Sequence, residues 1–214
     1  MSARQPLVLL GAGGASREAA EAAEATGRFD VLGFLDDDAG KHGTFVSGRP
    51  VLGPLDAVAD HPDAVFVAGM GNPRAPRSRQ AVVGRLGLDD DRFATVVHPL
   101  ASAPPSCRLG AGVVLLAGVV LTADVTVGRH VLVMPGCVLT HDDEVGDFAS
   151  LAAGVLVAGG VTIGRAAYLG AGVRIRENLT VGEGALIGMG SLVLRDVGPG
   201  EVWYGAPARL VSGG

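Results

Sequence analysis

A chain of 214 residues, 48% of them hydrophobic, is long enough to bury one large core or two modest ones, which argues against a disordered protein. Its formal net charge of −5, without a long run of Lys or Arg, argues against a surface built for nucleic acid. Thirty-four glycines beside only 4% aromatic residues are typical of a fold that repeats tight turns around small interior side chains.

The first apolar segment, residues 6–10, is too short for the core of a signal peptide or for a membrane span. We therefore expect no membrane insertion and a cytoplasmic location. The segment predicts a strand, and a turn with Gly11, Gly13 and Gly14 leads from it into an Ala- and Glu-rich helix over residues 17–25. Such a turn can present backbone N–H groups to a phosphate. Ser16 replaces the third glycine of G-x-G-x-x-G, which leaves a plain structural turn as the alternative.

Two further predicted strands end in polar loops. Residues 31–35 run into Asp36, Asp37 and Asp38, and residues 64–68 run into a loop over residues 69–72. The carboxyl ends of parallel strands meet at one edge of a sheet, where ligands of open α/β sheets bind. We therefore predict an α/β Rossmann-like domain over residues 1–97 that binds a nucleotide-type ligand. The candidate substrate-binding residues are Gly11, Gly13, Gly14, Asp36, Asp37, Gly71, Asn72 and Arg77.

Three arginines, Arg74, Arg77 and Arg79, follow the last of these loops. They could meet a phosphate at the same sheet edge, or they could form a solvated face of the next helix. Further along, VVHP at residues 96–99 marks the exit from the domain. The Pro-rich segment ASAPPS, residues 101–106, is expected to join this domain to the next one.

A six-residue repeat runs through the second half of the chain. From Cys107 to Asp196 the sequence divides without insertion into fifteen hexapeptides, and the third residue of each is Leu, Val or Ile. Residues two apart on a strand share a face, so the small or β-branched first residue points inward beside the third. We therefore interpret Cys107 and Cys137, both first residues, as core residues and not as a disulfide framework.

Asp143 is the exception among the first residues. A buried carboxylate is costly unless it is hydrogen-bonded, so we expect a polar neighbour, such as His141, or a distorted turn.

The spacing of the repeat predicts the architecture. Gly, Asp and Asn crowd the fourth to sixth positions, where a turn in every unit needs residues that tolerate positive φ. A strict period of six fits no helical periodicity, which argues against a helical bundle. Three units make one coil, so fifteen units predict five stacked coils, a prism on the order of 24 Å tall. The expected fold is an all-β parallel β-helix over residues 98–214 with a C-terminal cap, whose flat faces favour self-association.

Several segments together resemble one family: LVLLGAGG, VLGFLDDD, GMGN, VVHP, THDDEVGDF within the hexapeptide array, and the ending YGAPARL. They are similar to the bacterial hexapeptide-repeat sugar acetyltransferases, which include sialic acid O-acetyltransferases and UDP-4-amino-sugar N-acetyltransferases. The resemblance covers nearly the whole chain. It implies a left-handed β-helix, a homotrimer, and acetyl-CoA as the acyl donor, with no metal.

The resemblance also implies the residues of an active site. In the family a histidine followed by an acidic residue is the catalytic base and its partner, which here matches His141 and Asp142. An imidazole can accept a proton near neutral pH while an amine or hydroxyl attacks a thioester. A turn histidine without a role is the alternative. The residues implied for acetyl-CoA, in a groove between two subunits, are Ser150, Gly159, Ala171, Met189, Arg174 and Arg209, with Arg176 and Arg195 as further candidates for its phosphates.

Two of these residues carry a specific expectation. The Gly159 N–H would polarise the thioester carbonyl as an oxyanion donor. Ser150 stands where some members of the family have a second histidine, so the contact of that histidine with the acyl donor has no direct counterpart here.

These inferences predict transfer of an acetyl group from acetyl-CoA to a sugar, first of all to the 4-amino group of a UDP-linked deoxy-amino sugar. O-acetylation of sialic acid or a related sugar is the alternative within the family. A non-catalytic sugar-nucleotide-binding or scaffolding protein is the alternative of another class, whereas an NAD-dependent enzyme lacks a hydride-transfer motif downstream. A zinc-dependent β-helix carbonic anhydrase needs three histidines on the metal, and the array holds only His130 and His141, with His98 before it.

Overall fold

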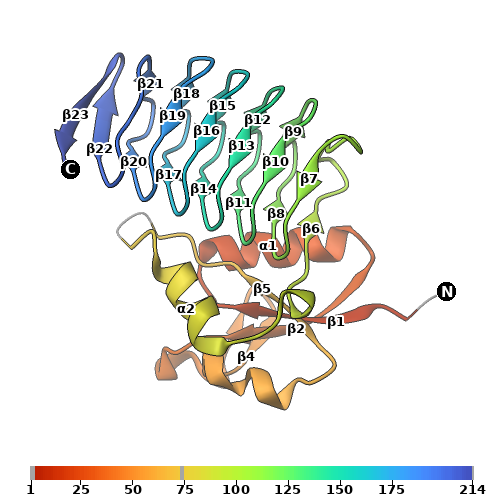
Figure 1. Ribbon diagram of the computed structural model, residues 1–214. Helices are drawn as coiled ribbons and strands as arrows, with labels where there is room; N and C mark the ends of the chain where they lie inside the picture. The colour runs from red at the N-terminus through yellow and green to blue at the C-terminus, as the bar shows by residue number, and fades with distance from the viewer. Residues whose placement is uncertain (1–2, 73–74, 214) are drawn as a thin grey trace.

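The computed structural model describes residues 3–72 and 75–213. Figure 1 shows two parts, an α/β domain built from the first half of the chain and a prism of stacked coils that ends at the C-terminus. No helix in the described part of the chain is long and apolar enough to cross a membrane.

The α/β domain contains a five-stranded sheet of order β3-β4-β2-β1-β5, parallel except for β3, which pairs antiparallel with β4. Its elements are β1 (Gln5–Leu10), α1 (Gly14–Ala25), β2 (Phe29–Leu35), η1 (Ala39–Lys41), β3 (Phe45–Val46), β4 (Arg49–Gly53), η2 (Leu55–Asp60), β5 (Val65–Ala68), α2 (Ser78–Leu86) and η3 (Asp90–Arg92). The three predicted strands and the first helix are confirmed. Their parallel order brings the ends of β1, β2 and β5 to one edge.

The central strand β1 is buried on both faces, as expected for a covered parallel sheet. Leu7 and Leu9 pack toward α1, whose inner face consists of alanines. Val8 and Leu10 pack toward η2 on the other side. The core beneath α1 also includes Leu132 of the prism, so the inner face of α1 is covered by the sheet and by the coils. The two parts of the chain therefore share a hydrophobic core.

Fifteen short strands, β7 to β21, occupy the second and third positions of the fifteen hexapeptides. Their bounds are Arg108–Leu109, Val114–Leu115, Val120–Leu121, Thr126–Val127, Leu132–Val133, Val138–Leu139, Glu144–Val145, Ser150–Leu151, Leu156–Val157, Thr162–Ile163, Tyr168–Leu169, Arg174–Ile175, Thr180–Val181, Leu186–Ile187 and Leu192–Val193. Each pairs in parallel with its counterpart one coil away, as Thr126 does with Arg108 and Glu144.

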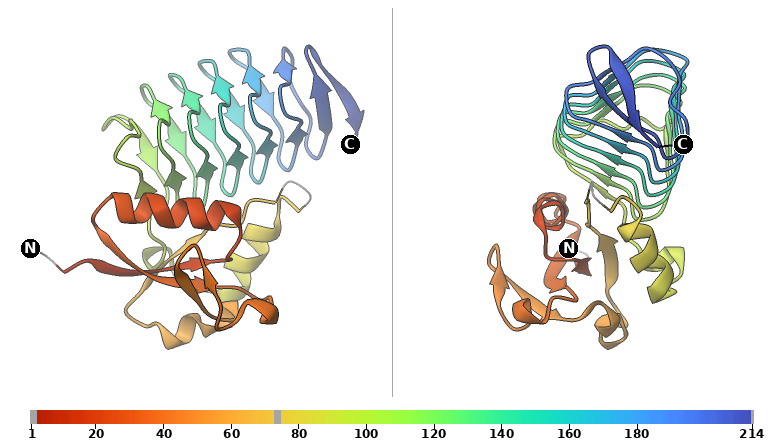
Figure 2. Two further views of the ribbon diagram at one scale, coloured as in Figure 1. Left: turned by 180° about the vertical axis from the view of Figure 1, so that it is seen from behind. Right: turned by 90° about the vertical axis from the view of Figure 1, so that its left-hand side faces the viewer.

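Three sheets form the sides of the triangular prism, which is seen along its axis in the right-hand view of Figure 2. The domain-facing sheet contains β8, β11, β14, β17 and β20, and its side chains meet the α/β domain. The apolar outer sheet contains β9, β12, β15, β18 and β21, and the polar outer sheet contains β7, β10, β13, β16 and β19. The predicted α/β domain followed by a left-handed parallel β-helix is thereby confirmed.

The prism interior is made of the first- and third-position side chains, as the repeat predicts. Cys137 is fully buried, and Cys107 is partly exposed against the same core. Every sixth-position residue from the first to the fourteenth unit has positive φ, including the non-glycine residues His130, Asp142 and Phe148. Each turn therefore places its left-handed residue at the sixth position, where Gly, Asp and Asn adopt this conformation most readily.

The prism begins before the first hexapeptide. β6 (Val96–Val97) pairs with β8, and Ser102 bridges Val120. By their hydrogen bonds, residues 96–102 form an incomplete first coil, so the Pro-rich segment is packed on the prism and is not a free linker. At the other end β22 (Val202–Gly205) and β23 (Ala208–Ser212) form an antiparallel hairpin whose buried Trp203 closes the core.

Candidate active site

The fifth-position residues of the hexapeptides form three columns along the edges of the prism, because equivalent residues stack from coil to coil. The histidine edge, between the apolar and polar outer sheets, consists of Ala123, His141, Gly159, Glu177 and Arg195. The small-residue edge, between the domain-facing and apolar outer sheets, consists of Ala117, Pro135, Ala153, Ala171 and Met189. The charged edge, between the polar outer and domain-facing sheets, consists of Ala111, Arg129, Asp147, Arg165 and Glu183.

His141 and Asp142 form a hydrogen-bonded pair in the turn after β12. The distance from His141 Nδ1 to Asp142 Oδ2 is 2.8 Å, and both side chains are 69% exposed. A carboxylate at Nδ1 selects the tautomer that carries its proton there, which leaves Nε2 as a proton acceptor. The positive φ of Asp142, 62°, belongs to the regular turn of the repeat. The arrangement is therefore that of an imidazole base oriented by a carboxylate.

Gly159 lies directly against the ring of His141. A Cβ atom at this position would lie 2.4 Å from His141 Cε1 and 2.5 Å from Nε2. The flanking backbone is fixed, because Gly160 N–H donates to the His141 carbonyl and Asn178 N–H donates to that of Gly159. The Gly159 N–H itself donates to no acceptor in the described part of the chain. Any side chain larger than that of glycine at position 159 would therefore collide with the His141 ring in its present position.

The buried carboxyl of Asp143 bonds to backbone and not to His141. Its Oδ2 accepts the N–H of Thr140 at 2.8 Å, and its Oδ1 accepts the N–H of Val161 at 2.9 Å. Desolvation raises the pKa of Asp143 to about 6, against the opposing effect of these two hydrogen bonds. Asp143 therefore stabilises the turn of His141 from inside the prism and links this turn to the next coil through Val161.

The predicted sheet edge of the α/β domain holds a cavity of about 250 Å³. Its lining contains most of the glycines and polar residues that the sequence singles out. They are Gly11, Gly13, Gly14, Asp36, Gly71 and Asn72, joined by Ala15, Ser16, Lys41, Gly69 and Met70. We call it the nucleotide cavity, after the ligand that the sequence predicts.

Asp36 organises one wall of the nucleotide cavity. It accepts the N–H of Ala12 at 2.7 Å, the N–H of Asp38 at 2.9 Å and Lys41 Nζ at 3.1 Å. Desolvation acts to raise the pKa of Asp36, but these hydrogen bonds outweigh it and lower the pKa. Lys41 is a lining residue that the sequence reasoning missed. Its signal was Asp38, which caps η1 and turns the chain back toward Asp36.

Ser16 and Gly69 explain the departure from the dinucleotide motif. Ser16 is buried, and its hydroxyl donates to the Leu10 carbonyl. A Cβ at Gly69 would lie 2.5 Å from Ser16 Oγ and 2.6 Å from its Cα. The third glycine of the motif allows a close approach of helix and strand, and here Gly69, the residue directly after β5, allows it instead.

Other predicted substrate residues lie elsewhere. Asp37 faces away from the nucleotide cavity, where it accepts the Leu55 N–H at 3.0 Å and pairs with Arg85 at 2.9 Å. Arg77 is exposed and pairs with Glu183 on the charged edge at 3.3 Å. Arg74 lies outside the described residues. Arg79 is neither on a solvated face nor in the nucleotide cavity, because it is buried against the prism.

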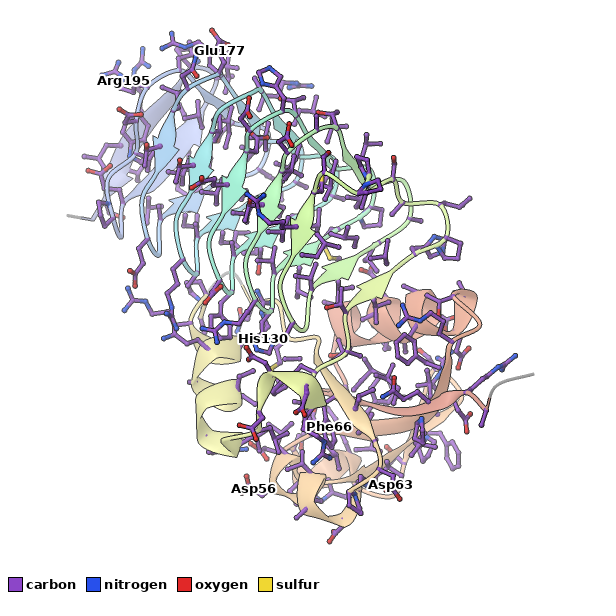
Figure 3. The ribbon with its side chains drawn as sticks, turned by 45° about the vertical axis from the view of Figure 1, so that its right-hand side comes forward. Asp56, Asp63, Phe66, His130, Glu177 and Arg195 are labelled. Carbon is purple, nitrogen blue, oxygen red and sulfur yellow. The ribbon has the colours of Figure 1, made fainter. Side chains whose placement is uncertain are left out.

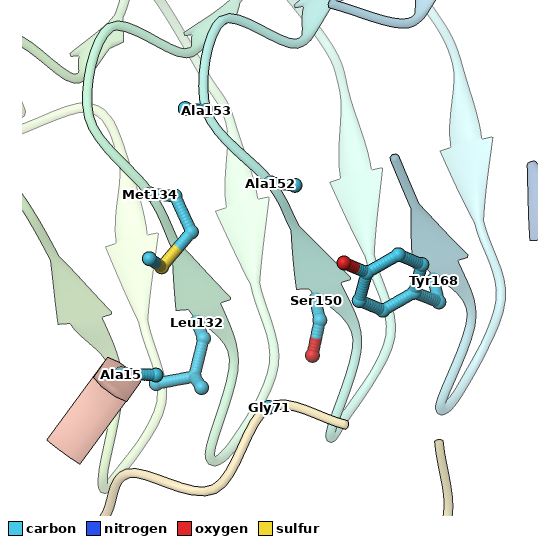
Figure 4. A pocket seen from close by; sticks show the side chains of 8 residues that line it. All are labelled: Ala15, Gly71, Leu132, Met134, Ser150, Ala152, Ala153 and Tyr168. Carbon is cyan, nitrogen blue, oxygen red and sulfur yellow. The ribbon is translucent and has the colours of Figure 1, made fainter. Parts of the chain in front are cut away.

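A small pocket of about 110 Å³ lies between the two parts of the molecule, and we call it the interdomain pocket (Figure 4). It is lined by Ala15 and Gly71 from the α/β domain and by Leu132, Met134, Ser150, Ala152, Ala153 and Tyr168 from the prism. Ala15 and Gly71 also line the nucleotide cavity. The two spaces are therefore adjacent.

A third space, the coil groove, measures about 350 Å³ along the domain-facing sheet and the small-residue edge. It contains the predicted Ala171 and Met189, and the sequence reasoning missed its Tyr168 and Tyr204. The full lining is Ala152, Tyr168, Gly170, Ala171, Leu186, Ile187, Gly188, Met189 and Tyr204. Ala152 and Tyr168 also line the interdomain pocket, so three spaces follow one another along a single face. Arg174 and Arg209 are exposed outside this lining.

Within one chain, the predicted catalytic and cofactor residues lie on different edges. His141, Asp142 and Gly159 are on the histidine edge, whereas Ala171 and Met189 are on the small-residue edge and Ser150 is on the domain-facing sheet. The side formed by the apolar outer sheet separates the two edges. The residues implied for one active site are therefore not brought together by a single copy of the chain.

Among the described residues, no group of three His, Cys, Asp or Glu side chains is placed to hold a metal ion. His130 is buried where the two parts meet (Figure 3), with its ring stacked on Phe148 at 5.0 Å and edge-on to Phe93 at 4.6 Å. Desolvation, together with the charge of Arg79, lowers the pKa of His130 to about 4. His130 is thus a neutral core residue on a different edge from His141.

Comparison with known proteins identifies relatives of this chain. Residues 6–86 match the family described as the PglD N-terminal domain. The chain is 32% identical over 116 residues to UDP-N-acetylbacillosamine N-acetyltransferase from Bacillus subtilis (strain 168). This alignment covers 52% of the chain and 51% of that protein, so it spans about half the length of the relative.

Two solved structures are similar over nearly the whole chain. The acetyltransferase domain of PglB from Neisseria gonorrhoeae FA1090, in complex with acetyl coenzyme A, is 28% identical with a TM-score of 0.87, covering 98% of this chain and 100% of that one. PerB from Caulobacter crescentus, in complex with CoA and GDP-perosamine, is 30% identical with a TM-score of 0.85, covering 97% of both chains. The chain belongs to the hexapeptide-repeat sugar acetyltransferases of the PglD type.

Proposed function

We propose that the protein is a homotrimeric enzyme that transfers an acetyl group from acetyl-CoA to the amino group of a nucleotide-linked sugar, with His141 as the general base. The observation that carries this proposal is the His141–Asp142 pair seated on Gly159, in a chain that belongs to this family. The nucleotide sugar would occupy the nucleotide cavity and the interdomain pocket. The acyl donor would lie along the coil groove.

The proposed step needs one base and one oxyanion donor. The amine nitrogen attacks the carbonyl carbon of the thioester, and His141 Nε2 takes the proton that the nitrogen loses. The tetrahedral intermediate then expels the CoA thiolate, which leaves as the thiol after accepting that proton from the His141 imidazolium. Asp142 would stabilise the imidazolium through Nδ1–H, as the acid of a catalytic triad does. The unpartnered N–H of Gly159 would donate to the oxyanion.

The substrate class comes from the relatives. The Bacillus subtilis relative is named for a UDP-linked sugar, and the Caulobacter crescentus structure contains GDP-perosamine. We therefore propose a UDP-linked 4-amino sugar as the first substrate and a GDP-linked one as the alternative. O-acetylation of sialic acid is the competing reaction within the family.

A trimer would bring the divided residues together. The outward, second-position residues of the apolar outer sheet are Val120, Val138, Leu156, Arg174 and Leu192. Those of the polar outer sheet are Arg108, Thr126, Glu144, Thr162 and Thr180. Four of the five residues in the first set are aliphatic, whereas none in the second set is. Burying the first set against a second copy would set the histidine edge of one chain beside the small-residue edge of the next.

A thiol-release assay tests the function. We expect the wild-type protein to release CoA thiol with acetyl-CoA and a UDP- or GDP-linked 4-amino sugar, and not with free sialic acid. His141→Ala should lower kcat about 1000-fold. The fold should not change, because the side chain is exposed on the single chain. The matched control is His61→Ala, at the end of η2 in the α/β domain, which should keep full activity.

Three outcomes would change the assignment. Full activity of His141→Ala at neutral pH would remove His141 as the base. Thiol release with sialic acid alone would replace N-acetylation by O-acetylation. Nucleotide binding without any thiol release would favour the non-catalytic binding protein.

A further inference from the structure

Arg79, on α2, is the largest fully buried side chain of the described structure, with 1% of its surface exposed. No Asp or Glu of the described ranges forms an ion pair with it. Desolvation lowers its pKa to about 10, so the guanidinium remains charged at neutral pH. Burying a charge without a counter-charge is costly, and an apolar side chain would serve packing better. The position therefore calls for an explanation beyond packing.

The hydrogen bonds of Arg79 connect the walls of two spaces. Nη1 donates to the carbonyl of Met70, in the loop that lines the nucleotide cavity. Nη2 donates to the carbonyls of Phe148 and Ala149, at 2.7 and 2.9 Å, and to Ser150 Oγ at 2.9 Å. Ser150 lines the interdomain pocket. We call residues 69–72 the nucleotide loop, and one charged side chain thus holds this loop against the prism.

The bond to Arg79 also decides what Ser150 can do. A serine hydroxyl has one donor and two acceptor sites, and here Arg79 uses an acceptor site. The hydroxyl proton donates to no acceptor in the described part of the chain. A cation at the oxygen makes that proton a better donor. Figure 4 shows the Ser150 hydroxyl directed toward the loop that carries Gly71, in a pocket whose other polar side chain is Tyr168.

We propose that Arg79 is a positioning residue: it fixes the nucleotide loop to the prism and presents the Ser150 hydroxyl as a hydrogen-bond donor to an oxygen of the sugar bound in the interdomain pocket. The sugar is the partner because this pocket adjoins the nucleotide cavity at Ala15 and Gly71. The inference rests on the proposed function for the identity of the sugar. It does not rest on that function for the link between Arg79 and the nucleotide loop.

Steady-state kinetics of Arg79→Lys, Ser150→Ala and the double variant test the proposal. Lysine keeps the charge but cannot reach four oxygens in the geometry of a guanidinium. We expect Arg79→Lys to lower kcat/KM for the nucleotide sugar about 100-fold, since a small misplacement of bound substrate has an effect of this size. Ser150→Ala should lower it about tenfold, the effect of about 1.4 kcal/mol from one hydrogen bond. The KM for acetyl-CoA should stay unchanged in both.

The double variant separates positioning from mere anchoring. If Arg79 acts through Ser150, the double variant should be no worse than Arg79→Lys alone. Effects of the two substitutions on kcat/KM that multiply would show that Arg79 and Ser150 act independently, and this result would overturn the proposal. A rise in the KM for acetyl-CoA alone would also overturn it. Arg28→Lys is the matched control, since Arg28 is an exposed arginine directly before β2, at the opposite edge of the sheet, and it should behave as wild type.

Two further measurements keep the test decisive. Where Arg79→Lys does not fold, Ser150→Ala and Ser150→Thr replace it, because both leave Arg79 in place. Threonine retains the hydroxyl and should restore activity, and equal activity of the wild type, Ser150→Ala and Ser150→Thr would refute the role of Ser150.

Calorimetry with UDP and GDP, without any acyl donor, measures nucleotide affinity and so tests the position of the nucleotide loop directly. Arg79→Lys should bind either nucleotide about tenfold more weakly than the wild type. If the wild-type protein transfers no acetyl group, the proposed function fails, and equal nucleotide affinity of wild type and Arg79→Lys would still refute the role of Arg79.

Discussion

The prism and the α/β domain depend on different kinds of contact, periodic ones in the prism and single long-range ones in the domain. In the prism each coil repeats the same inward positions, so one rule about the third residue of a hexapeptide specifies fifteen strands. In the α/β domain the cavity depends on single contacts between distant segments, such as the bond from Ala12 to Asp36. The comparison shows that repetition specifies the scaffold, whereas the candidate site is specified by single residues and contacts that no period encodes. Four predictions test this division.

The largest effect is expected at the histidine edge, where Gly159 adjoins the ring of His141. Gly159→Ala places a methyl group on the imidazole of His141, whose exposed ring must swing away from its seat. Activity in the thiol-release assay should fall about 1000-fold, the full contribution of a general base, while the fold is kept. Gly84→Ala is the control, because a Cβ added to this exposed helical glycine would have no atom within 4 Å. It should be active and slightly more stable, by up to about 1 kcal/mol. Normal activity of Gly159→Ala would show that the position of the His141 ring against Gly159 is unimportant for catalysis.

The second effect concerns the repeat itself. Leu139→Ala removes a fully buried third-position side chain beside the His141 turn. The free energy of unfolding, measured with denaturant, should fall by about 3 kcal/mol. Thr162→Ala, an outward second-position change on the polar outer sheet, should alter it by less than about 0.5 kcal/mol. Equal effects of the two substitutions would contradict the inward and outward assignment of the hexapeptide.

The third effect is a pH dependence caused by Asp143. Its pKa is about 6 in the folded chain and about 4 in an unfolded one, so between these values the folded state holds the extra proton. Stability from this group is therefore full below about pH 4 and is lost as the pH rises through about 6. Relative to Asp143→Asn, the wild-type unfolding free energy should fall by between about 2 and 3 kcal/mol over this window. A constant difference between the two proteins from pH 4 to pH 7 would contradict the burial of this carboxyl.

The smallest effect distinguishes the two neighbouring acids at the end of β2. Asp36→Asn weakens the bonds to the Ala12 N–H and to Lys41, and nucleotide affinity measured by calorimetry should fall about tenfold. Asp37 faces Leu55 and Arg85 instead, so Asp37→Asn should leave that affinity unchanged. The reverse result would place the ligand on the other side of the strand.

Sequence reasoning succeeded where the governing contacts are local or periodic. The strand, turn and helix at the start of the chain, the prism, and the pairing of His141 with Asp142 all follow from residues close together in sequence. It was less informative about the arginines after the third strand. Arg79 and Arg77 are two residues apart on the same segment, yet one is buried against the prism and the other pairs with Glu183. Their neighbours come from about 70 and 106 positions away, which no local pattern encodes.

By itself the sequence determined the stacked coils, because every unit meets a copy of its own pattern one coil away and the aliphatic third residue can only face inward. It also determined the histidine turn, since both side chains lie in one hexapeptide. Only the tertiary structure decided which of the polar loops share a cavity, that Asp143 bonds to backbone, and that the three spaces adjoin along one face of the prism. Those features depend on how α1 and α2 pack against the domain-facing sheet. The side chains buried between these two parts come from segments far apart in the sequence, so they produce no periodic pattern in it.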